Sequence, residues 1–111
     1  MSKSAQDFLS EANSMVPSIT VEEALSLINS GKAVVIDVRD GKEIDQSGTV
    51  KNALRIPRGM IEFVADPTTS FYNNQISNDK EILVICGAGG MAALTGKTLI
   101  EMGYTLSLIH I

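Results

Sequence analysis

The chain has few of the residues that build disulfides and metal sites. It contains one cysteine and one histidine among its 111 residues. A single cysteine cannot form a disulfide within the chain, which favours a reducing, cytoplasmic location. One cysteine and one histidine are also too few for the usual ligand set of a structural zinc site. We therefore expect a domain that needs neither a metal nor another cofactor.

Positive charge and long apolar runs are scarce as well. The chain has 9 Lys and Arg residues against 13 Asp and Glu residues, a formal net charge of -4. Nucleic acids and anionic membranes require clustered cations, so neither is an expected partner. No apolar run approaches the roughly 18 residues of a membrane span, and the polar N-terminus lacks the apolar core of a signal peptide. This composition is typical of one soluble globular domain.

The last residues of the chain, 106–111, read LSLIHI. This segment matches a translation of the transposon end that is used in sequencing-library adapters. We interpret it as a non-native tail that replaces the natural continuation beyond Thr105, so its histidine, His110, is set aside as a catalytic base. The chain then divides into a lead-in at 1–15, a domain at 16–105 and the tail.

Apolar periodicity predicts helices between the strands. Thr20 and Glu23 have the spacing of a capping box, and Gly31 suits the position just past a helix end. The apolar face of that helix is expected at Val21, Ala24, Leu25 and Ile28. Further helical segments are expected at 59–64, at 71–75 and at 91–102, the last ending at Gly103.

The apolar run at 33–36 predicts a strand that is buried on both faces, and further strands are expected at 53–57 and 81–85. Strands that alternate with helices indicate an α/β fold with a parallel sheet. In such sheets, ligand sites form at the carboxyl ends of the strands.

Cys86 lies at the carboxyl end of the third predicted strand. The loop that follows and the first residues of the next helix are Gly87, Ala88, Gly89, Gly90, Met91 and Ala92. Glycines allow several backbone N–H groups to converge, and a helix N-terminus adds partial positive charge, so both favour a thiolate over a thiol. The alternative is an inert buried thiol that merely ends a strand.

Charged residues follow the two other strands. Asp37 and Arg39 alternate along the first strand and can point to one region near the cysteine loop. Alternatively, Arg39 forms an ion pair with Glu43 that fixes the following loop. Arg58 is the best remaining cation for binding an anionic substrate, unless it is a solvated surface charge.

Four segments, taken in order, together resemble the rhodanese-like domain family over about residues 16 to 105. Residues 35–39 with Glu43 resemble its D-V-R-x-x-x-E signature, and 48–57 resemble its G-H-I-x-x-A…I-P stretch. Residues 84–90 resemble its cysteine loop, and the helix after that loop has the family's L-x-x-M-G-Y ending at Tyr104.

The resemblance implies a three-layer sandwich, with a parallel sheet of up to five strands and helices on both faces. It implies a sulfurtransferase without a cofactor. Cys86 would take sulfane sulfur from a donor such as thiosulfate as a persulfide, and would pass it to a thiol, to cyanide or to a protein acceptor. Gly87 to Ala92 would bind the substrate, with Asp37, Arg39 and Arg58 in support.

The sequence departs from the family pattern at several positions. Met91 stands where family loops often carry arginine, and Ala92 where they often carry serine or threonine, so less positive charge is available for thiosulfate. Thr49 stands where a histidine is common. The family's terminal helix is missing after Thr105, which would leave a sheet face uncovered.

Three other functions remain open. A non-catalytic binding or regulatory module of the same family would have an unactivated Cys86. A nucleotide-binding Rossmann module fits the G-x-G-x-x-A pattern at 87–92, although no acidic residue follows at the expected distance. A cysteine-dependent phosphatase would need an arginine where Ala92 stands.

Overall fold

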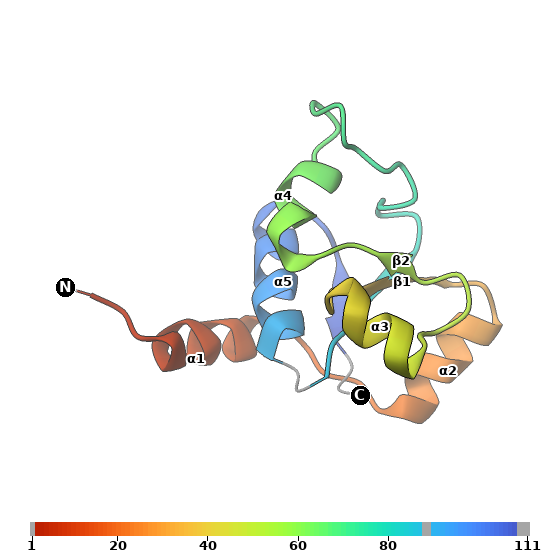
Figure 1. The fold of residues 1–111 in the computed structure, drawn as a ribbon, viewed down its shortest axis with the longest axis horizontal. Coiled ribbons are helices and arrows are strands. Elements are labelled where there is room, and N and C mark those ends of the chain that lie inside the picture. The colour runs from red at the N-terminus through yellow and green to blue at the C-terminus, as the bar shows by residue number, and fades with distance from the viewer. Residues whose placement is uncertain (1, 88–89, 109–111) are drawn as a thin grey trace.

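The structure is a computed structural model that describes residues 2–87 and 90–108 (Figure 1). Its helices are α1 (Ala5–Met15), α2 (Val21–Asn29), α3 (Gly41–Ser47), α4 (Ile61–Val64) and α5 (Gly90–Glu101), with a 3-10 turn η1 (Arg58–Met60) before α4. Its strands are β1 (Ala33–Asp37), β2 (Leu54–Arg55), β3 (Glu81–Ile85) and β4 (Leu106–Leu108). Within the described residues, none of the helices has both the length and the apolar character needed to cross a membrane.

The first two helices begin at capping boxes. Ser4 and Asp7 cap α1, so the lead-in is helical. The predicted pair caps α2, where the Glu23 N–H donates to Thr20 Oγ1 over 3.1 Å and Glu23 Oε1 accepts from the Thr20 N–H over 3.2 Å. Gly31 follows α2 with a φ of 72°, a left-handed conformation that glycine adopts without strain. Hydrogen bonds to the backbone groups that have no partner within the helix therefore set where these helices begin and end.

The four strands form one parallel sheet in the order β2-β1-β3-β4. The central pair is in register from Ala33 opposite Glu81 to Asp37 opposite Ile85. The expected parallel α/β sheet is thereby confirmed. β4 belongs to the segment interpreted as a tail, and it pairs with β3 from Ile82 to Val84.

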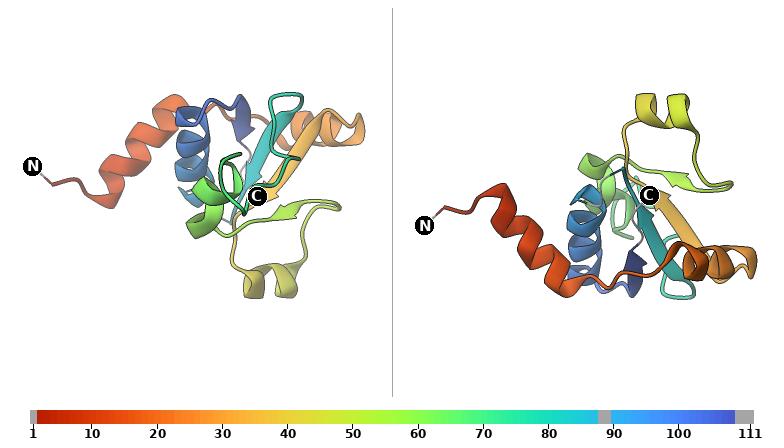
Figure 2. Two further views of the ribbon diagram at one scale, coloured as in Figure 1. Left: turned by 90° about the horizontal axis from the view of Figure 1, so that it is seen from above. Right: turned by 90° about the horizontal axis from the view of Figure 1, so that it is seen from below.

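Side chains from alternate positions of β1 and β3 enter two separate cores. On one face, the buried Ile36, Ile82 and Val84 pack with residues of α1, α4 and α5. On the other face, Val35, Leu83 and Ile85 pack with Ala24 of α2 and with partly buried neighbours. Figure 2 shows α1 and α5 on one side of the sheet and α2 on the other. The expected three layers are confirmed, and these strand residues are covered on both faces.

Two expectations about local structure are wrong. Residues 71–75 form turns rather than a helix. The side chain of Asn73 accepts a hydrogen bond from the backbone N–H of Gln75 over 2.9 Å, and such local bonds compete with helix formation. In α2, the residues facing the sheet are Ala24, Leu27 and Ile28, whereas Val21 and Leu25 are each 50% exposed.

The polar stretch after β1 holds a helix, α3, for which the sequence reading gave no expectation. Asp40 is its N-cap, and the Asp40 carboxylate accepts from the Glu43 N–H over 3.1 Å. The buried Ile44 anchors the helix, and Gly48 ends it with a φ of 75°. An aspartate followed three residues later by a glutamate is a helix-start signal that was available in the sequence.

Candidate functional site

The candidate site forms where the two central strands end. β1 and β3 are parallel and in register at Asp37 and Ile85, so the residues after them emerge side by side. The Val38 N–H donates to the Ile85 carbonyl over 3.2 Å and extends the pairing by one step. Arg39 and Cys86 thus come to the same edge of the sheet, as the positions of the strand ends predict.

Cys86 lies at the boundary between the sheet and α5. It is 3% exposed. Its Sγ accepts a hydrogen bond from the backbone N–H of Ala92, in the first turn of α5, over 3.3 Å. A donor N–H and the positive end of a helix dipole both stabilise negative charge on sulfur. Of the predicted loop, Gly87 and Met91 are exposed and Gly90 begins α5, whereas residues 88–89 lie outside the described residues.

Asp37 accepts several hydrogen bonds near the cysteine. It is fully buried. Its Oδ2 accepts from Arg39 Nη2 over 2.7 Å and from Thr49 Oγ1 over 2.6 Å. Its Oδ1 accepts from Arg39 Nε over 3.0 Å and from the Arg39 N–H over 3.1 Å. Burial alone would raise the pKa of Asp37, but the hydrogen bonds from Arg39 and Thr49 outweigh it and hold the pKa below its ordinary value.

Arg39 joins Asp37 to the C-terminal end of α3. Its Nη1 donates to Ser47 Oγ over 2.7 Å and its Nη2 donates to the Gly48 carbonyl over 2.7 Å. The hydrogen bond to Asp37 is the main cause of the raised pKa of Arg39. Among the described residues the ion pair of Arg39 is with Asp37. The alternative pairing with Glu43 is therefore wrong, because the carboxylate on the same strand lies within bidentate reach.

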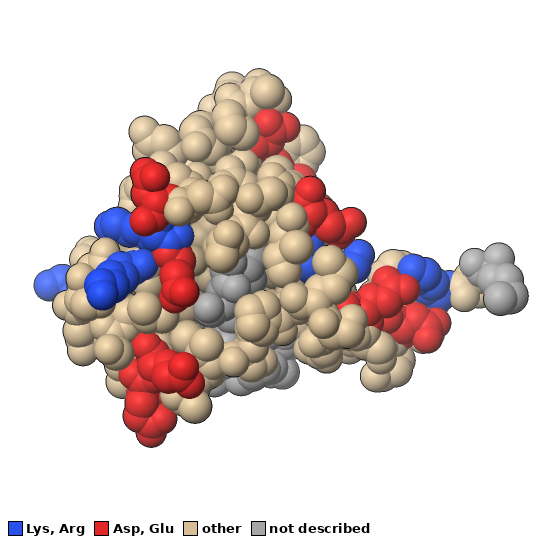
Figure 3. Space-filling view, turned by 180° about the vertical axis from the view of Figure 1, so that it is seen from behind, with Lys and Arg blue, Asp and Glu red and all other residues tan. Residues whose placement is uncertain are grey.

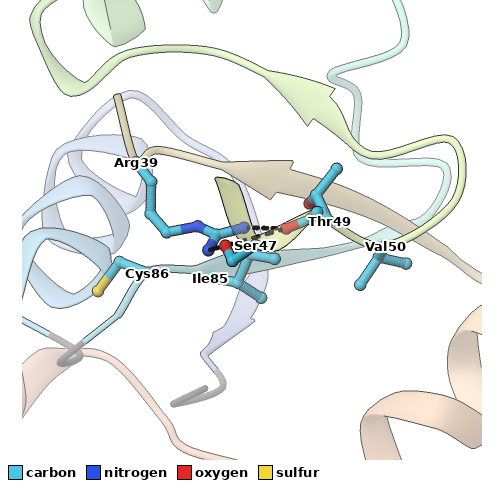
Figure 4. Close-up of a pocket in the computed structure, with 7 residues that line it drawn as sticks. Arg39, Ser47, Thr49, Val50, Ile85 and Cys86 are labelled. Carbon is cyan, nitrogen blue, oxygen red and sulfur yellow. Dashed lines mark hydrogen bonds between the residues drawn. The ribbon is translucent and has the colours of Figure 1, made fainter. Parts of the chain in front are cut away.

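A pocket of about 330 Å³ opens beside these groups. It is lined by Arg39, Ser47, Gly48, Thr49, Val50, Ile85 and Cys86. Figure 4 shows the guanidinium of Arg39 turned toward Ser47 and Thr49, while the sulfur of Cys86 points to the α5 side. The pocket wall thus combines one engaged cation, hydroxyl groups and two aliphatic side chains.

The structure does not bring every predicted residue into this pocket. Arg58 is not among its lining residues. Arg58 Nη1 pairs with Glu62 over 3.0 Å, and Arg58 Nη2 donates to Thr98 Oγ1 on α5 over 3.1 Å. Its predicted contact with an anionic substrate stays a prediction. Within the described part of the chain, no three His, Cys, Asp or Glu side chains cluster as metal ligands.

Four further residues of the pocket were not predicted as site residues: Ser47, Gly48, Thr49 and Val50. They reach the site because α3 and Gly48 turn the chain back across the end of β1. The helix-start signal at Asp40 and the glycine at 48 mark this turn, but neither indicates that Arg39 and Asp37 bind there.

Comparison with known proteins gives one family and several similar folds. The model of the rhodanese-like domain family matches residues 20–110. No curated protein matches the chain significantly. A protein of unknown function from Rhodopseudomonas palustris, described as a possible tyrosine phosphatase, is 31% identical with a TM-score of 0.90, and the match covers 99% of this chain and 86% of that one.

Two other solved structures are similar over most of the chain. A rhodanese-related protein from Thermoplasma volcanium is 21% identical with a TM-score of 0.66, over 85% of this chain and 83% of that one. A variant of EanB, solved with ergothioneine covalently linked to a cysteine persulfide, is 25% identical with a TM-score of 0.65. That match covers 86% of this chain but only 24% of EanB.

Proposed function

The chain belongs to the rhodanese-like domain family, which includes sulfurtransferases, and on that premise we propose that it transfers sulfane sulfur through a persulfide on Cys86. The observation that carries the proposal is the hydrogen bond from the Ala92 N–H to the Cys86 sulfur at the N-terminus of α5. The covalent persulfide described for the EanB variant is further support.

The proposed reaction has two steps. In the first, the Cys86 thiolate attacks the sulfane sulfur of a donor. A new S–S bond forms, the bond between the sulfane sulfur and the rest of the donor breaks, and the leaving group departs with its electron pair. In the second, an acceptor thiolate or cyanide attacks the outer sulfur of the persulfide, and the Cys86 thiolate is restored. One neutral sulfur atom moves in each step.

The residues around Cys86 would assist in two ways: they would stabilise negative charge on the sulfur and fix the shape of the pocket wall. The Ala92 N–H and the α5 N-terminus would stabilise the negative charge of the thiolate before the attack and that of the persulfide after it. The Asp37, Arg39 and Thr49 cluster would act as positioning residues. It holds the 47–50 segment against the end of β1 and so shapes the pocket wall next to the cysteine.

Intact-mass measurement tests this function directly. The folded protein is incubated separately with thiosulfate and with an organic thiosulfonate. We expect a gain of one sulfur atom, its removal by cyanide with release of thiocyanate, and no gain in Cys86→Ser. A folded protein that gains no sulfur from either donor contradicts the proposal and favours a non-catalytic binding module.

The Rhodopseudomonas palustris relative, described as a possible tyrosine phosphatase, favours a second candidate function. Cysteine phosphatases hold phosphate with an arginine in the loop after the nucleophile, but here Ala92 occupies that position. The arginine nearest the pocket, Arg39, is engaged by Asp37. We therefore expect no turnover of para-nitrophenyl phosphate by the wild-type protein, and turnover abolished by Cys86→Ser would support the phosphatase instead.

A further inference from the structure

The size of the pocket beside Cys86 suits an organic molecule. Pockets that bind small organic ligands have volumes of about 300 to 1,000 Å³, and this pocket has about 330 Å³. Its aliphatic wall comes from Val50 and Ile85, and its polar wall from Ser47 and Thr49. A small inorganic anion would fill little of this space and would leave the aliphatic wall without a partner.

Among the described residues that line the pocket, only Arg39 carries a full charge, and it is paired with Asp37. Its Nε and Nη2 bind the fully buried carboxylate of Asp37 at 3.0 and 2.7 Å. Its Nη2 also binds the Gly48 carbonyl, and its Nη1 binds Ser47. To bind a dianion, Arg39 would have to abandon hydrogen bonds to a buried carboxylate, which is costly.

The surroundings supply little further positive charge. Glu43 acts electrostatically on Arg39 and adds to the negative charge around it. Residues 87–96 contain no lysine or arginine. The next cation on α5, Lys97, pairs with Glu101 over 3.1 Å. On the face drawn in Figure 3, lysine and arginine side chains lie beside aspartate and glutamate side chains.

We infer that the sulfur donor of this site is an organic sulfane-sulfur compound with one negative charge and an apolar body, rather than the thiosulfate dianion. The inference rests on the proposed sulfur transfer at Cys86. The apolar body would lie against Val50 and Ile85, and the Cys86 side chain would turn its sulfur from the α5 side toward the sulfane sulfur of the donor. With a thiosulfonate donor, the enzyme S–S bond forms as the donor S–S bond breaks, and the sulfinate leaves with the electron pair.

Donor competition measures this preference. The probes are benzenethiosulfonate, methanethiosulfonate and thiosulfate, and the readout is the second-order rate of Cys86 persulfide formation by intact mass. Because donors differ in intrinsic reactivity, each rate is divided by the rate of the same donor with a free small-molecule thiol. We expect the corrected rate to fall in the order benzene, methane, thiosulfate, with each step roughly tenfold or more.

Two pairs of variants separate charge from apolar contact. Met91 lies in the first turn of α5 and is 39% exposed, so Met91→Arg adds a cation near Cys86 at little steric cost. Met91→Gln is the neutral control. We expect Met91→Arg alone to raise the thiosulfate rate relative to methanethiosulfonate by about tenfold, as one added charge at short range predicts. Val50→Thr keeps the shape of valine and should reduce the benzene over methane preference severalfold, whereas Val50→Ile should preserve it.

The outcomes distinguish this inference from the proposed function. Persulfide formation with thiosulfate at a corrected rate equal to or above that of the organic donors overturns the inference and leaves sulfur transfer intact. An unchanged donor ratio in Met91→Arg also overturns it, because charge would then not decide the preference. Failure of all three donors on the folded protein overturns the proposed function, and the inference with it.

Discussion

Replacement of Asp37 by asparagine should destabilise the domain by about 3 kcal/mol, at the lower end of the cost of breaking a buried ion pair. The asparagine side chain would keep the shape of the aspartate but lose the charge that binds Arg39 and Thr49. Breaking a buried ion pair costs about 3 to 5 kcal/mol, and we expect the lower end because the Arg39 side chain is still 16% exposed and can partly rehydrate. Unfolding free energies of native domains are about 5 to 15 kcal/mol, so this loss would be a large fraction of the total.

Thr49 provides a second measurement of the same cluster. Thr49→Val removes the hydroxyl that donates to Asp37 over 2.6 Å and should cost about 2 kcal/mol, as expected for a hydrogen bond to a charged group. Thr49→Ser keeps the donor and should cost less than half of that. In the Asp37→Asn background, the cost of Thr49→Val should fall below about 1 kcal/mol, because the two residues act through one hydrogen-bond network.

Urea denaturation followed by circular dichroism gives these free energies, provided that the slope m stays constant. A cost below about 1 kcal/mol for Asp37→Asn, or full additivity with Thr49→Val, would refute the reasoning. Either result would mean that the carboxylate does not hold the cluster together.

Three further outcomes are expected. Although burial favours the protonated acid, the hydrogen bonds lower the folded pKa of Asp37, so its stabilisation is complete above about pH 4 and is lost as the pH falls further; urea midpoints should show a smaller loss in Asp37→Asn than in the parent, because the lowered pKa values of Asp7 and Asp66 remain. Ala92→Pro removes the N–H that donates to Cys86 and should slow iodoacetamide alkylation severalfold, while Ala92→Gly should not. Thr95 Oγ1 is buried without a hydrogen-bond partner in the described structure. Thr95→Val should therefore raise the free energy of unfolding by about 1 kcal/mol, which urea denaturation would measure.

Helices and strands that are determined by residues close together in the sequence could be predicted. Thr20 and Glu23 satisfy each other's backbone groups, and the apolar runs at 33–36 and 82–85 have no polar residue to expose. These local features are enough to predict a helix start and two strands that must be covered on both faces. The parallel arrangement follows, and with it the position of Cys86 at a strand end.

Orientation and competition between local structures were harder to predict. The apolar stripe on α2 is wide enough that either Leu25 or Leu27 could face the sheet, and periodicity does not choose between them. Only the packing against β1 and β3 selects Leu27. In the segment 71–75, the Asn73 side chain accepts a hydrogen bond from the backbone two residues on, which favours turns over a helix.

The charge state of the site depends on contacts that no sequence pattern contains. Asp37 and Arg39 at a strand end predict a charged pair near the cysteine loop, and Arg39 lines the pocket beside Cys86. Its hydrogen bonds to Asp37, Ser47 and Gly48 nevertheless direct its positive charge into the protein. The partners at 47 and 48 arrive only because α3 turns the chain back. Substrate preference at this site is therefore a property of the tertiary pairing, and it can differ between two chains that share the same motifs.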